Sequence, residues 1–299
     1  MLPSCCNLCE SKNITVKADS VFGDESHKKA FYHCHNCDVV FQYPFFSKTE
    51  EDEFYKKSFE RYMSDRSGNS AWLGADEHVE SNQGTFLRRF DFLKDWIRDF
   101  NEKEVLEIGC SSGFMLFPLA ELGAKVNGIE PSAVFSEYLI HKEVNLYSDL
   151  KEVPDQSMDI VMHFFVMEHI TDIKTWLQEQ YRILKPGGSI IIEVPSWDDP
   201  LHTVFNNSAF HQFYWSLVHP WYFNKASVVF LMDGMGFSDV EIVPYQRYGL
   251  KNHFNWAISN SPGMDESLVH ITEDLDKSYK KSLEAIEKTD TILIKINKL

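Results

Sequence analysis

The stretch Val105-Leu106-Glu107-Ile108-Gly109-Cys110-Ser111-Ser112-Gly113-Phe114 decides the fold of this chain. The apolar residues 105–108 predict a buried strand, which runs into a glycine-punctuated turn and then into a helix. A second apolar run at 126–129 ends in Glu130. Glycines let a backbone approach a ligand closely, and a carboxylate at the next strand end can accept hydrogen bonds from a ribose. The pattern predicts a βαβ unit that binds a ribose-containing cofactor.

The spacing of glycines in the turn indicates which class of cofactor is bound. A dinucleotide cradle reads G-x-G-x-x-G, whereas this turn reads Gly109-x-Ser111-x-Gly113 and is preceded by Glu107. It resembles the first motif of class I S-adenosylmethionine (SAM) dependent methyltransferases, E/D-x-G-x-G-x-G, with Ser111 in place of the middle glycine. The resemblance implies SAM as the cofactor, with contacts from Glu107, Gly109, Cys110, Ser111, Gly113, Glu130, Pro131, Asp149, Leu150, His163 and Phe164.

Later segments resemble the following motifs of the same family, in order. They are the strand at 159–163, the pair Glu168-His169, the turn at 185–188 and the strand at 189–195. Short buried strands that alternate with helices are typical of a doubly wound sheet. We therefore expect an α/β fold with a mostly parallel, seven-stranded, Rossmann-like methyltransferase sheet. The predicted strands cover 105–108, 126–129, 144–147, 158–163, 189–194, 239–243 and 291–296.

Helices are expected where apolar residues recur at helical spacing, over 85–100, 225–233 and 272–288. The first helix to cover the sheet must lie between Gly113 and Gly123, yet it contains Pro118. Proline is tolerated only near a helix start. This helix is therefore expected to begin late or to be kinked.

Two alternatives to a SAM-dependent enzyme remain. The same Gly109-x-Ser111-x-Gly113 matches the nucleophile elbow of α/β-hydrolases, in which Ser111 would be the nucleophile of an esterase. That interpretation leaves Glu107, Glu130 and Asp149 without a role. A binding protein that kept the SAM fold and lost catalysis would show the same residues.

Composition limits the classes of protein that fit. The chain has 299 residues, 43% hydrophobic and 25% charged, which fits one large domain and a small one. The N-terminus lacks a signal-peptide pattern and no apolar run approaches the length of a membrane span, so a cytoplasmic protein without a membrane partner is expected. A net charge of −16 argues against a nucleic-acid partner. The expected partner is a small-molecule acceptor, and the oligomeric state is left open.

Five of the six cysteines lie in the first 37 residues. The pairs Cys6-x-x-Cys9 and Cys34-x-x-Cys37 have the spacing of a four-thiolate zinc ribbon. Cys5, His33 or His35 could replace one ligand, and disulfides are the other possibility, although a reducing compartment disfavours them. Four protein thiolates leave no open position on zinc, which favours a structural role.

The expected domain organisation has three parts. Residues 1–46 form a zinc-ribbon-like module, residues 47–84 a linker or lid, and residues 85–299 the SAM-binding methyltransferase domain. Within that domain an aromatic cap at 196–230 and a looped insertion at 245–271 form the expected substrate region. Its candidate acceptor-binding residues are Tyr222, His211, Asn252 and His253.

Methyl transfer requires an acceptor atom held in line with the methyl group and, for many acceptors, a base. His169 and His219 are the candidate bases, and an ordinary structural histidine is the competing interpretation of each. The combined layout is similar to bacterial methyltransferases that act on nucleotide-linked sugars. The carbon-methylating members have a Glu-His pair where this chain has Val218-His219, so O- or N-methylation of a small polar metabolite, such as a sugar or nucleotide-linked sugar, is favoured.

Overall fold

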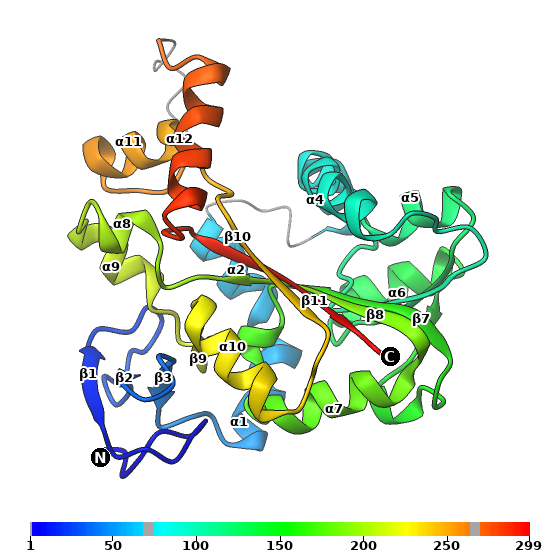
Figure 1. The fold of residues 1–299 in the computed structure, drawn as a ribbon, viewed down its shortest axis with the longest axis horizontal. Helices are drawn as coiled ribbons and strands as arrows, with labels where there is room; N and C mark the ends of the chain where they lie inside the picture. Colours follow the sequence, from blue (N-terminus) through cyan, green and yellow to red (C-terminus); the bar gives the residue numbers. More distant parts are fainter. Residues whose placement is uncertain (1, 68–73, 264–269) are drawn as a thin grey trace. The chain divides into compact units, whose positions relative to one another are not determined.

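The computed structural model describes residues 2–67, 74–263 and 270–299, and the chain forms two compact units (Figure 1). Unit 1 comprises Met1–Phe45, Phe165–Ile173 and Ile192–Lys295, and unit 2 comprises Phe46–Phe164, Lys174–Ile191 and Ile296–Leu299. This division differs from the boundaries expected at 46 and 84, which stay a prediction. Unit 1 joins the N-terminal module to later segments because they share a sheet.

The larger sheet has seven strands, as predicted. Its order is β10 (Val240–Tyr245), β11 (Thr291–Asn297), β8 (Leu184–Pro195), β7 (Met158–Phe164), β4 (Glu104–Ile108), β5 (Lys125–Ile129) and β6 (Asn145–Leu146). Strand β4 pairs in parallel with both β5 and β7, and β5 pairs in parallel with β6. The central strands β4 and β7 are buried along almost their whole length, and most of their residues are apolar, as expected for strands covered on both faces. The predicted Rossmann-like fold is confirmed.

Strand β8 begins five residues before the predicted start at residue 189. The extra segment is held by the C-terminal end of the chain, because the Gly187 amide donates to the Lys298 carbonyl at 2.7 Å and the Lys298 amide donates to the Gly188 carbonyl at 2.9 Å. The Lys298 ammonium also donates to the Leu184 carbonyl at 2.8 Å. The strand is thus extended by a pairing between residues far apart in sequence.

Helices α4 and α5 lie on the side of the β7 and β8 strands opposite α7 (Figure 1). Helix α5 begins at Leu116, so Pro118 is its third residue, and the late start predicted from that proline is confirmed. The expected linker contains three helices, and its residues 68–73 lie outside the described residues. The helices are α1 (Lys48–Lys57), α2 (Phe59–Ser67), α3 (Ala75–Ser81), α4 (Gln83–Trp96), α5 (Leu116–Glu121), α6 (Ala133–His141) and α7 (Ile173–Ile183).

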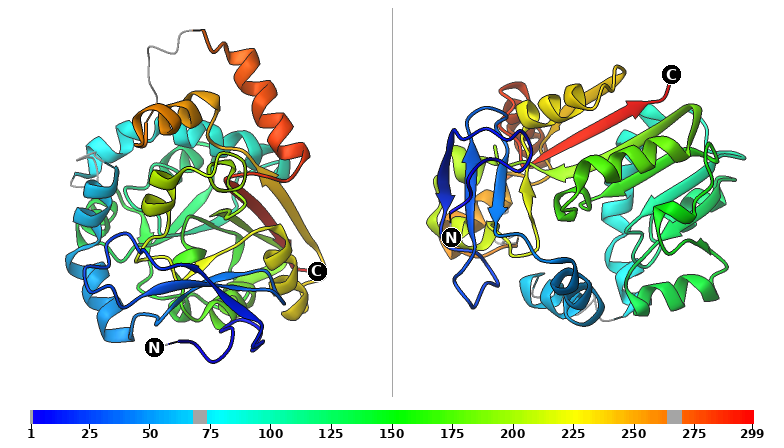
Figure 2. Two further views of the ribbon diagram at one scale, coloured as in Figure 1. Left: turned by 90° about the vertical axis from the view of Figure 1, so that its left-hand side faces the viewer. Right: turned by 90° about the horizontal axis from the view of Figure 1, so that it is seen from below.

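Unit 1 contains a second sheet that the sequence did not indicate. Its order is β1 (Ile14–Ala18), β2 (Ala30–Cys34), β3 (Val40–Tyr43) and β9 (Trp221–Tyr222), and the three N-terminal strands, dark blue to blue, run side by side in both views of Figure 2. Strand β3 pairs antiparallel with β9, with Val40 opposite Tyr222. The cysteine-containing module and the aromatic segment are therefore one structural element.

The insertion at 245–271 contains a helix that the sequence did not predict. Residues within the insertion at 245–271 were expected to form a loop, but residues 250–259 are helical, because Asn252, His253, Asn255 and Trp256 recur at helical spacing and are buried. Residues 264–269 of the insertion lie outside the described residues. The helices are α8 (Pro200–Thr203), α9 (Ser208–Tyr214), α10 (Lys225–Gly234), α11 (Leu250–Ser259) and α12 (Glu273–Ala285).

Candidate functional site

The turn after β4 adopts a left-handed backbone at three positions. Gly109, Ser111 and Gly113 have φ angles of 71°, 44° and 77°. A side-chain carbon at residue 113 would lie 2.7 Å from a Leu139 methyl group, so only glycine fits there. Ser111 holds the same conformation without being a glycine. The family motif has a glycine at this position for that conformational reason.

Glu130 fastens this turn to the end of β5. Its Oε2 accepts a hydrogen bond from the Ser111 amide at 2.7 Å, and its Oε1 accepts one from the Ser132 amide at 2.7 Å. A carboxylate offers about four lone-pair sites and, at the end of the strand next to the turn, can accept hydrogen bonds from the hydroxyls of a ribose. The position and orientation of Glu130 fit the predicted cofactor contact.

Glu107 is a buried carboxyl group with unused hydrogen-bonding capacity. It is 2% exposed, and its Oε2 has no hydrogen-bond partner within the described residues. Burial raises the pKa of Glu107 to about 8, against the opposing effect of Arg89 and with a further increase from Glu130. A buried oxygen without a donor indicates a site for a ligand that supplies one.

Arg89 of α4 is the neighbouring cation, and the sequence analysis missed it. It is 6% exposed, and its guanidinium carbon lies 4.3 Å from the centre of the Phe164 ring. Leu87 of the same helix is 65% exposed, although it is apolar and falls at helical spacing. Arg89 stands four residues before the buried Leu93, so both lie on the same face of α4. This helical spacing could have indicated from the sequence that Arg89 is buried.

A second missed residue is His78 of α3. Its Nδ1 lies 2.8 Å from the Ser112 hydroxyl oxygen, within hydrogen-bonding distance. Burial, with help from Arg89, lowers the pKa of His78 to about 4, so the ring is neutral at pH 7. The serine that meets a histidine here is therefore Ser112 and not Ser111, which gives no support to a hydrolase elbow at Ser111.

Four other residues predicted to contact the cofactor lie at the ends of β5, β6 and β7. Asp149 is exposed and its Oδ1 accepts a hydrogen bond from the Lys151 amide at 2.9 Å, which caps the short 3₁₀ helix Leu150–Glu152. Leu150 is buried and Pro131 is exposed. His163 is fully buried with its ring 4.6 Å from that of Trp176. Their assignment to the cofactor stays a prediction.

In unit 1 the structure brings together the two candidate bases. His169 and Glu168 belong to the 3₁₀ helix Met167–His169, and His219 precedes β9. The two imidazole ring centres lie 4.6 Å apart, and ligand atoms of all three side chains lie within 4.8 Å of one another. The Trp221 indole N–H donates to the Ile170 carbonyl at 2.8 Å and so links the two segments. Two imidazoles and a carboxylate can share a proton or hold a divalent cation.

Three of the residues predicted to bind the acceptor make hydrogen bonds to other residues of the protein. The Tyr222 hydroxyl accepts from the Ser216 amide at 2.9 Å and donates to the Tyr214 carbonyl. Asn252 donates to the Gly263 carbonyl at 3.0 Å, and His253 Nδ1 lies 2.6 Å from the Tyr279 hydroxyl. These contacts stabilise unit 1. A further role toward the acceptor stays a prediction for these three residues.

His211, the fourth of these residues, differs. Its ring centre lies 4.5 Å from that of His202, and the Nε2 atoms of both rings are buried without a hydrogen-bond partner in the part of the chain that the structure describes. Burial lowers the pKa of His211 and brings that of His202 to about 2. Both rings are therefore neutral at pH 7.

The four predicted metal ligands lie together. The sulfur atoms of Cys6, Cys9, Cys34 and Cys37 all lie within 4.8 Å of one another, with Cys6–Cys37 at 3.7 Å and Cys9–Cys34 at 3.5 Å. A tetrahedral zinc site with Zn–S bonds of about 2.3 Å has sulfur separations of about 3.8 Å. All six cysteines are free thiols. The arrangement fits zinc.

The alternative ligands of this cluster have other contacts. His33 Nε2 lies 2.6 Å from Asp38 Oδ1, and His35 Nε2 lies 3.0 Å from the Thr15 hydroxyl. Cys5 stands outside the four-sulfur group.

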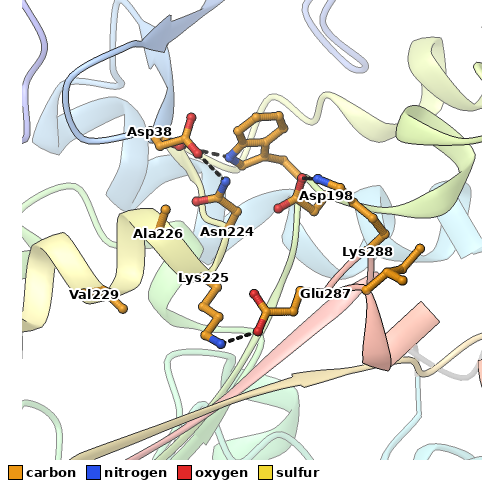
Figure 3. Close-up of a pocket in the computed structure, with 10 residues that line it drawn as sticks. Asp38, Asp198, Asn224, Lys225, Ala226, Val229, Glu287 and Lys288 are labelled. Carbon is orange, nitrogen blue, oxygen red and sulfur yellow. Dashed lines mark hydrogen bonds and ion pairs between the residues drawn. The ribbon is translucent and has the colours of Figure 1, made fainter. Parts of the chain in front are cut away.

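A cavity of about 600 Å³ lies in unit 1 beside the cysteine module (Figure 3). Asp38 is bonded there by Asn224 at 2.6 Å, and Lys288 lies 2.7 Å from Asp198. Lys225 and Glu287 form a further ion pair. Because both lysines that line this cavity already pair with acids, its lining offers no free cation to an anionic ligand.

The parallel sheet and its glycine-punctuated turn define a Rossmann-like, SAM-binding class of protein. The model of the methyltransferase domain family matches residues 79–242, which is more than half of the chain. The chain belongs to this family. The prediction of a class I SAM-dependent methyltransferase fold is thereby confirmed.

Curated relatives share part of the chain. A ubiquinone biosynthesis O-methyltransferase from Bradyrhizobium sp. is 34% identical over 113 residues, which are 35% of this chain and 45% of that protein. The human mitochondrial ubiquinone biosynthesis O-methyltransferase is 31% identical over 103 residues, 30% of this chain and 28% of that protein. The matches thus span less than half the length of these relatives.

Solved structures of low identity share the fold. A possible histamine N-methyltransferase from Thermotoga maritima has a TM-score of 0.51 at 18% identity and covers 81% of this chain and 98% of its own. Phosphoethanolamine N-methyltransferase 2 of Haemonchus contortus, solved with SAM, has a TM-score of 0.52 at 17% identity and covers 87% of this chain and 62% of its own. Within the described residues, no helix has both the length and the apolar character needed to cross a membrane.

Proposed function

We propose that this protein transfers the methyl group of SAM to a small polar acceptor. The observation that carries the proposal is the buried Oε2 of Glu107 near Arg89, which has no hydrogen-bond partner among the described residues. Glu107 lies in β4, just before the turn that Glu130 fastens to the next strand. Glu107 and Arg89 match the two charged groups of the methionine part of SAM, and Glu130 can accept hydrogen bonds from its uncharged ribose. When bound, SAM supplies a methyl group already activated on a positively charged sulfur.

The cofactor contacts follow from the local charges of unit 2. Glu107 would accept from the ammonium of the methionine part of SAM, since its Oε2 has no donor of its own among the described residues. Arg89 would pair with the carboxylate of the same part. Glu130, at the end of the neighbouring strand β5, would accept hydrogen bonds from the ribose hydroxyls.

The candidate bases of unit 1 would accept the proton of the acceptor. His169 and His219 lie in ring contact, and Glu168, 1% exposed, can orient either imidazole and stabilise its protonated form. A hydroxyl acceptor loses its proton as the methyl group is transferred, so a base is useful there. We therefore infer that the acceptor atom is an oxygen or a nitrogen that carries a proton.

The identity of the acceptor is the finer part of the proposal. The curated relatives are named as O-methyltransferases of ubiquinone biosynthesis, which supports oxygen as the methylated atom. The resemblance to enzymes of nucleotide-linked sugars favours a sugar hydroxyl or amine. We propose a small polar metabolite with such a group, and no nucleic acid, as the partner.

Variants of the two histidines test the proposed chemistry. His169→Gln and His219→Gln should each lower turnover by about 10²-fold or more if that residue is the base, while the dissociation constant of SAM stays within about twofold. His141→Gln, at an exposed end of α6, is the matched control. Formation of S-adenosylhomocysteine with a metabolite extract is the readout. Unchanged turnover in both variants would contradict this assignment, and no product with any extract would support the non-catalytic alternative.

We also propose that the four cysteines hold a structural zinc ion. The sulfur separations of 3.5 and 3.7 Å support it, and four thiolates leave no position for substrate. Its removal should affect stability before it affects any chemical step.

A further inference from the structure

Arg247, which follows β10 in unit 1, has a guanidinium group that meets no polar partner in residues 2–67, 74–263 and 270–299. Its centre lies 4.5 Å from the Phe165 ring and 4.3 Å from the Tyr248 ring. Among the residues that the structure describes, its Nε is buried with no hydrogen-bond partner, and no ion pair reaches the group within 4.0 Å. A guanidinium has five N–H donors. Leaving the buried Nε–H unused is costly unless a ligand accepts from it.

The backbone that carries Arg247 is rigidly held. Asp290 accepts hydrogen bonds from the amides of Arg247 at 2.9 Å and Tyr248 at 2.7 Å, and from the Gln246 side chain at 2.7 Å. The Thr291 hydroxyl donates to the same carboxylate at 2.7 Å. Asp290 thus accepts hydrogen bonds from four donors, one of which is the backbone amide of Arg247. A cation placed by such a network is preorganised for binding.

Nearby acids keep Arg247 charged without bonding to it. Asp290, Glu193 and Asp199 raise the pKa of Arg247, together with Tyr248 and against the effect of burial. Burial and the proximity of Asp290 in turn raise the pKa of Asp199 well above its usual range. Asp199 therefore holds a proton more readily than an ordinary aspartate does.

The aromatic ring beneath Arg247 leads to the histidine cluster. Phe165 directly follows β7 and stands three residues before Glu168. Its φ angle of 59° is unusual for a bulky residue, and its amide donates to the Glu193 carbonyl at 2.7 Å. Residues held in such conformations cluster at functional sites. Arg247 therefore stacks on the segment after β7 that also contains Glu168 and His169 of the proposed base cluster.

We propose that Arg247 binds an anionic group, a phosphate or a carboxylate, on the methyl acceptor. The planar fork of a guanidinium matches both groups with two parallel N–H···O bonds. The inference rests on the proposed function, because it names a chemical class for the same acceptor. It assigns Arg247 to acceptor recognition and not to SAM, whose candidate contacts are Glu107, Arg89 and Glu130.

Calorimetric titration of the full-length, zinc-loaded protein with inorganic pyrophosphate and, separately, with benzoate tests the inference. Wild-type protein should bind one of the two, and Arg247→Gln should weaken that binding by about tenfold or more. Arg61→Gln, which removes the same charge from a side chain that is 87% exposed, should match wild type. Tighter binding of pyrophosphate identifies a phosphate on the acceptor, and tighter binding of benzoate identifies a carboxylate.

Two results would overturn the inference. One is equal anion affinity of the Arg247→Gln and Arg61→Gln variants. The other is no binding of either anion to wild type at 10 mM, which corresponds to a binding free energy weaker than roughly 3 kcal/mol. If Arg247→Gln fails to fold, Arg247→Lys decides: it keeps the charge and loses the fork, so an unchanged affinity also overturns the inference. A parallel titration with SAM separates the two proposals. If wild-type protein does not bind SAM, the proposed function is wrong. If it binds SAM but neither anion, only this inference is wrong.

Discussion

The cofactor turn of unit 2 and the histidine cluster of unit 1 are built in different ways. Most of the turn comes from one stretch of chain, residues 105–114, with Glu130 at the end of the next strand. The histidine cluster combines residues 168–169 with His219, some fifty residues later, and its second segment is paired with strand β3 from the N-terminus. A site made by neighbouring residues can be identified from a motif, whereas a site made by distant segments requires the fold.

The largest effect is expected from breaking the cysteine cluster, on which only the second region depends. Cys34→Ser removes one of four proposed zinc ligands and should lower the melting temperature by more than about 10 °C, because metal binding provides much of the folding free energy of such modules. SAM affinity, measured below that temperature, should change by less than about threefold if the cofactor turn is self-contained. Zinc content and calorimetry measure both quantities.

Cys5→Ser is the matched control, since Cys5 neighbours the cluster in sequence and stands outside it. It should keep the melting temperature and the zinc content of wild type. If Cys34→Ser melts like Cys5→Ser, the metal site has no structural role. If SAM binding is lost with the zinc, the two regions are not independent.

The next effect concerns the cofactor turn alone. Glu130→Ala removes the acceptor of the Ser111 and Ser132 amides as well as the proposed ribose contact, and should weaken SAM binding by about 30- to 100-fold, or about 2–3 kcal/mol. Glu137→Ala, on the exposed side of α6, should leave it unchanged. Equal affinities in the two variants would remove Glu130 from the cofactor site.

The protein's stability and its affinity for SAM should both depend on pH through Glu107, which precedes the turn. The folded-state pKa of Glu107 is raised to about 8 from 4.5, so the folded protein holds this proton more tightly than the unfolded chain. The resulting stabilisation is complete below pH 4.5 and is lost as the pH rises toward 8. A SAM ammonium favours the ionised carboxylate, so SAM affinity should increase about tenfold between pH 6 and 8. Glu107→Gln should abolish this dependence, and a persisting slope would assign it to another group.

The smallest effect is expected at Ser111. Because its φ angle of 44° favours glycine, Ser111→Gly should raise the free energy of unfolding by about 1 kcal/mol and keep SAM affinity within about twofold. Chemical denaturation and calorimetry provide the two values. Complete loss of activity in a folded Ser111→Gly protein would instead identify Ser111 as a nucleophile.

The comparison explains what the sequence predicted. All seven strands of the large sheet were predicted, since buried parallel strands are continuous apolar runs between helices. The four cysteines lie together as their spacing predicts. Glu107 and Glu130 lie on the neighbouring strands beside the predicted turn, and their contact with SAM stays a prediction. The start of β8 was misplaced because its pairing with residue 298 leaves no local mark.

Residues placed by long-range packing escaped prediction. Arg89 lies among apolar residues on the buried face of α4, where a charged residue reads as an exposed one. Arg247 is placed by Asp290, 43 residues away in sequence. Helix α11 was taken for a loop because its buried face carries Asn252, His253 and Asn255, and polar residues on a buried face reverse the usual pattern.

The pairing of β3 with β9 has a consequence for synthesis of the chain. Val40 and Tyr222 are opposite one another, so the edge of β3 stays open until the ribosome has added about 180 further residues. The Gln42 side chain, which donates to the Leu217 carbonyl at 3.0 Å, also waits for its acceptor. An open strand edge can pair with another chain. The nascent N-terminus is therefore expected to need either zinc or a chaperone to remain monomeric before the C-terminal half emerges.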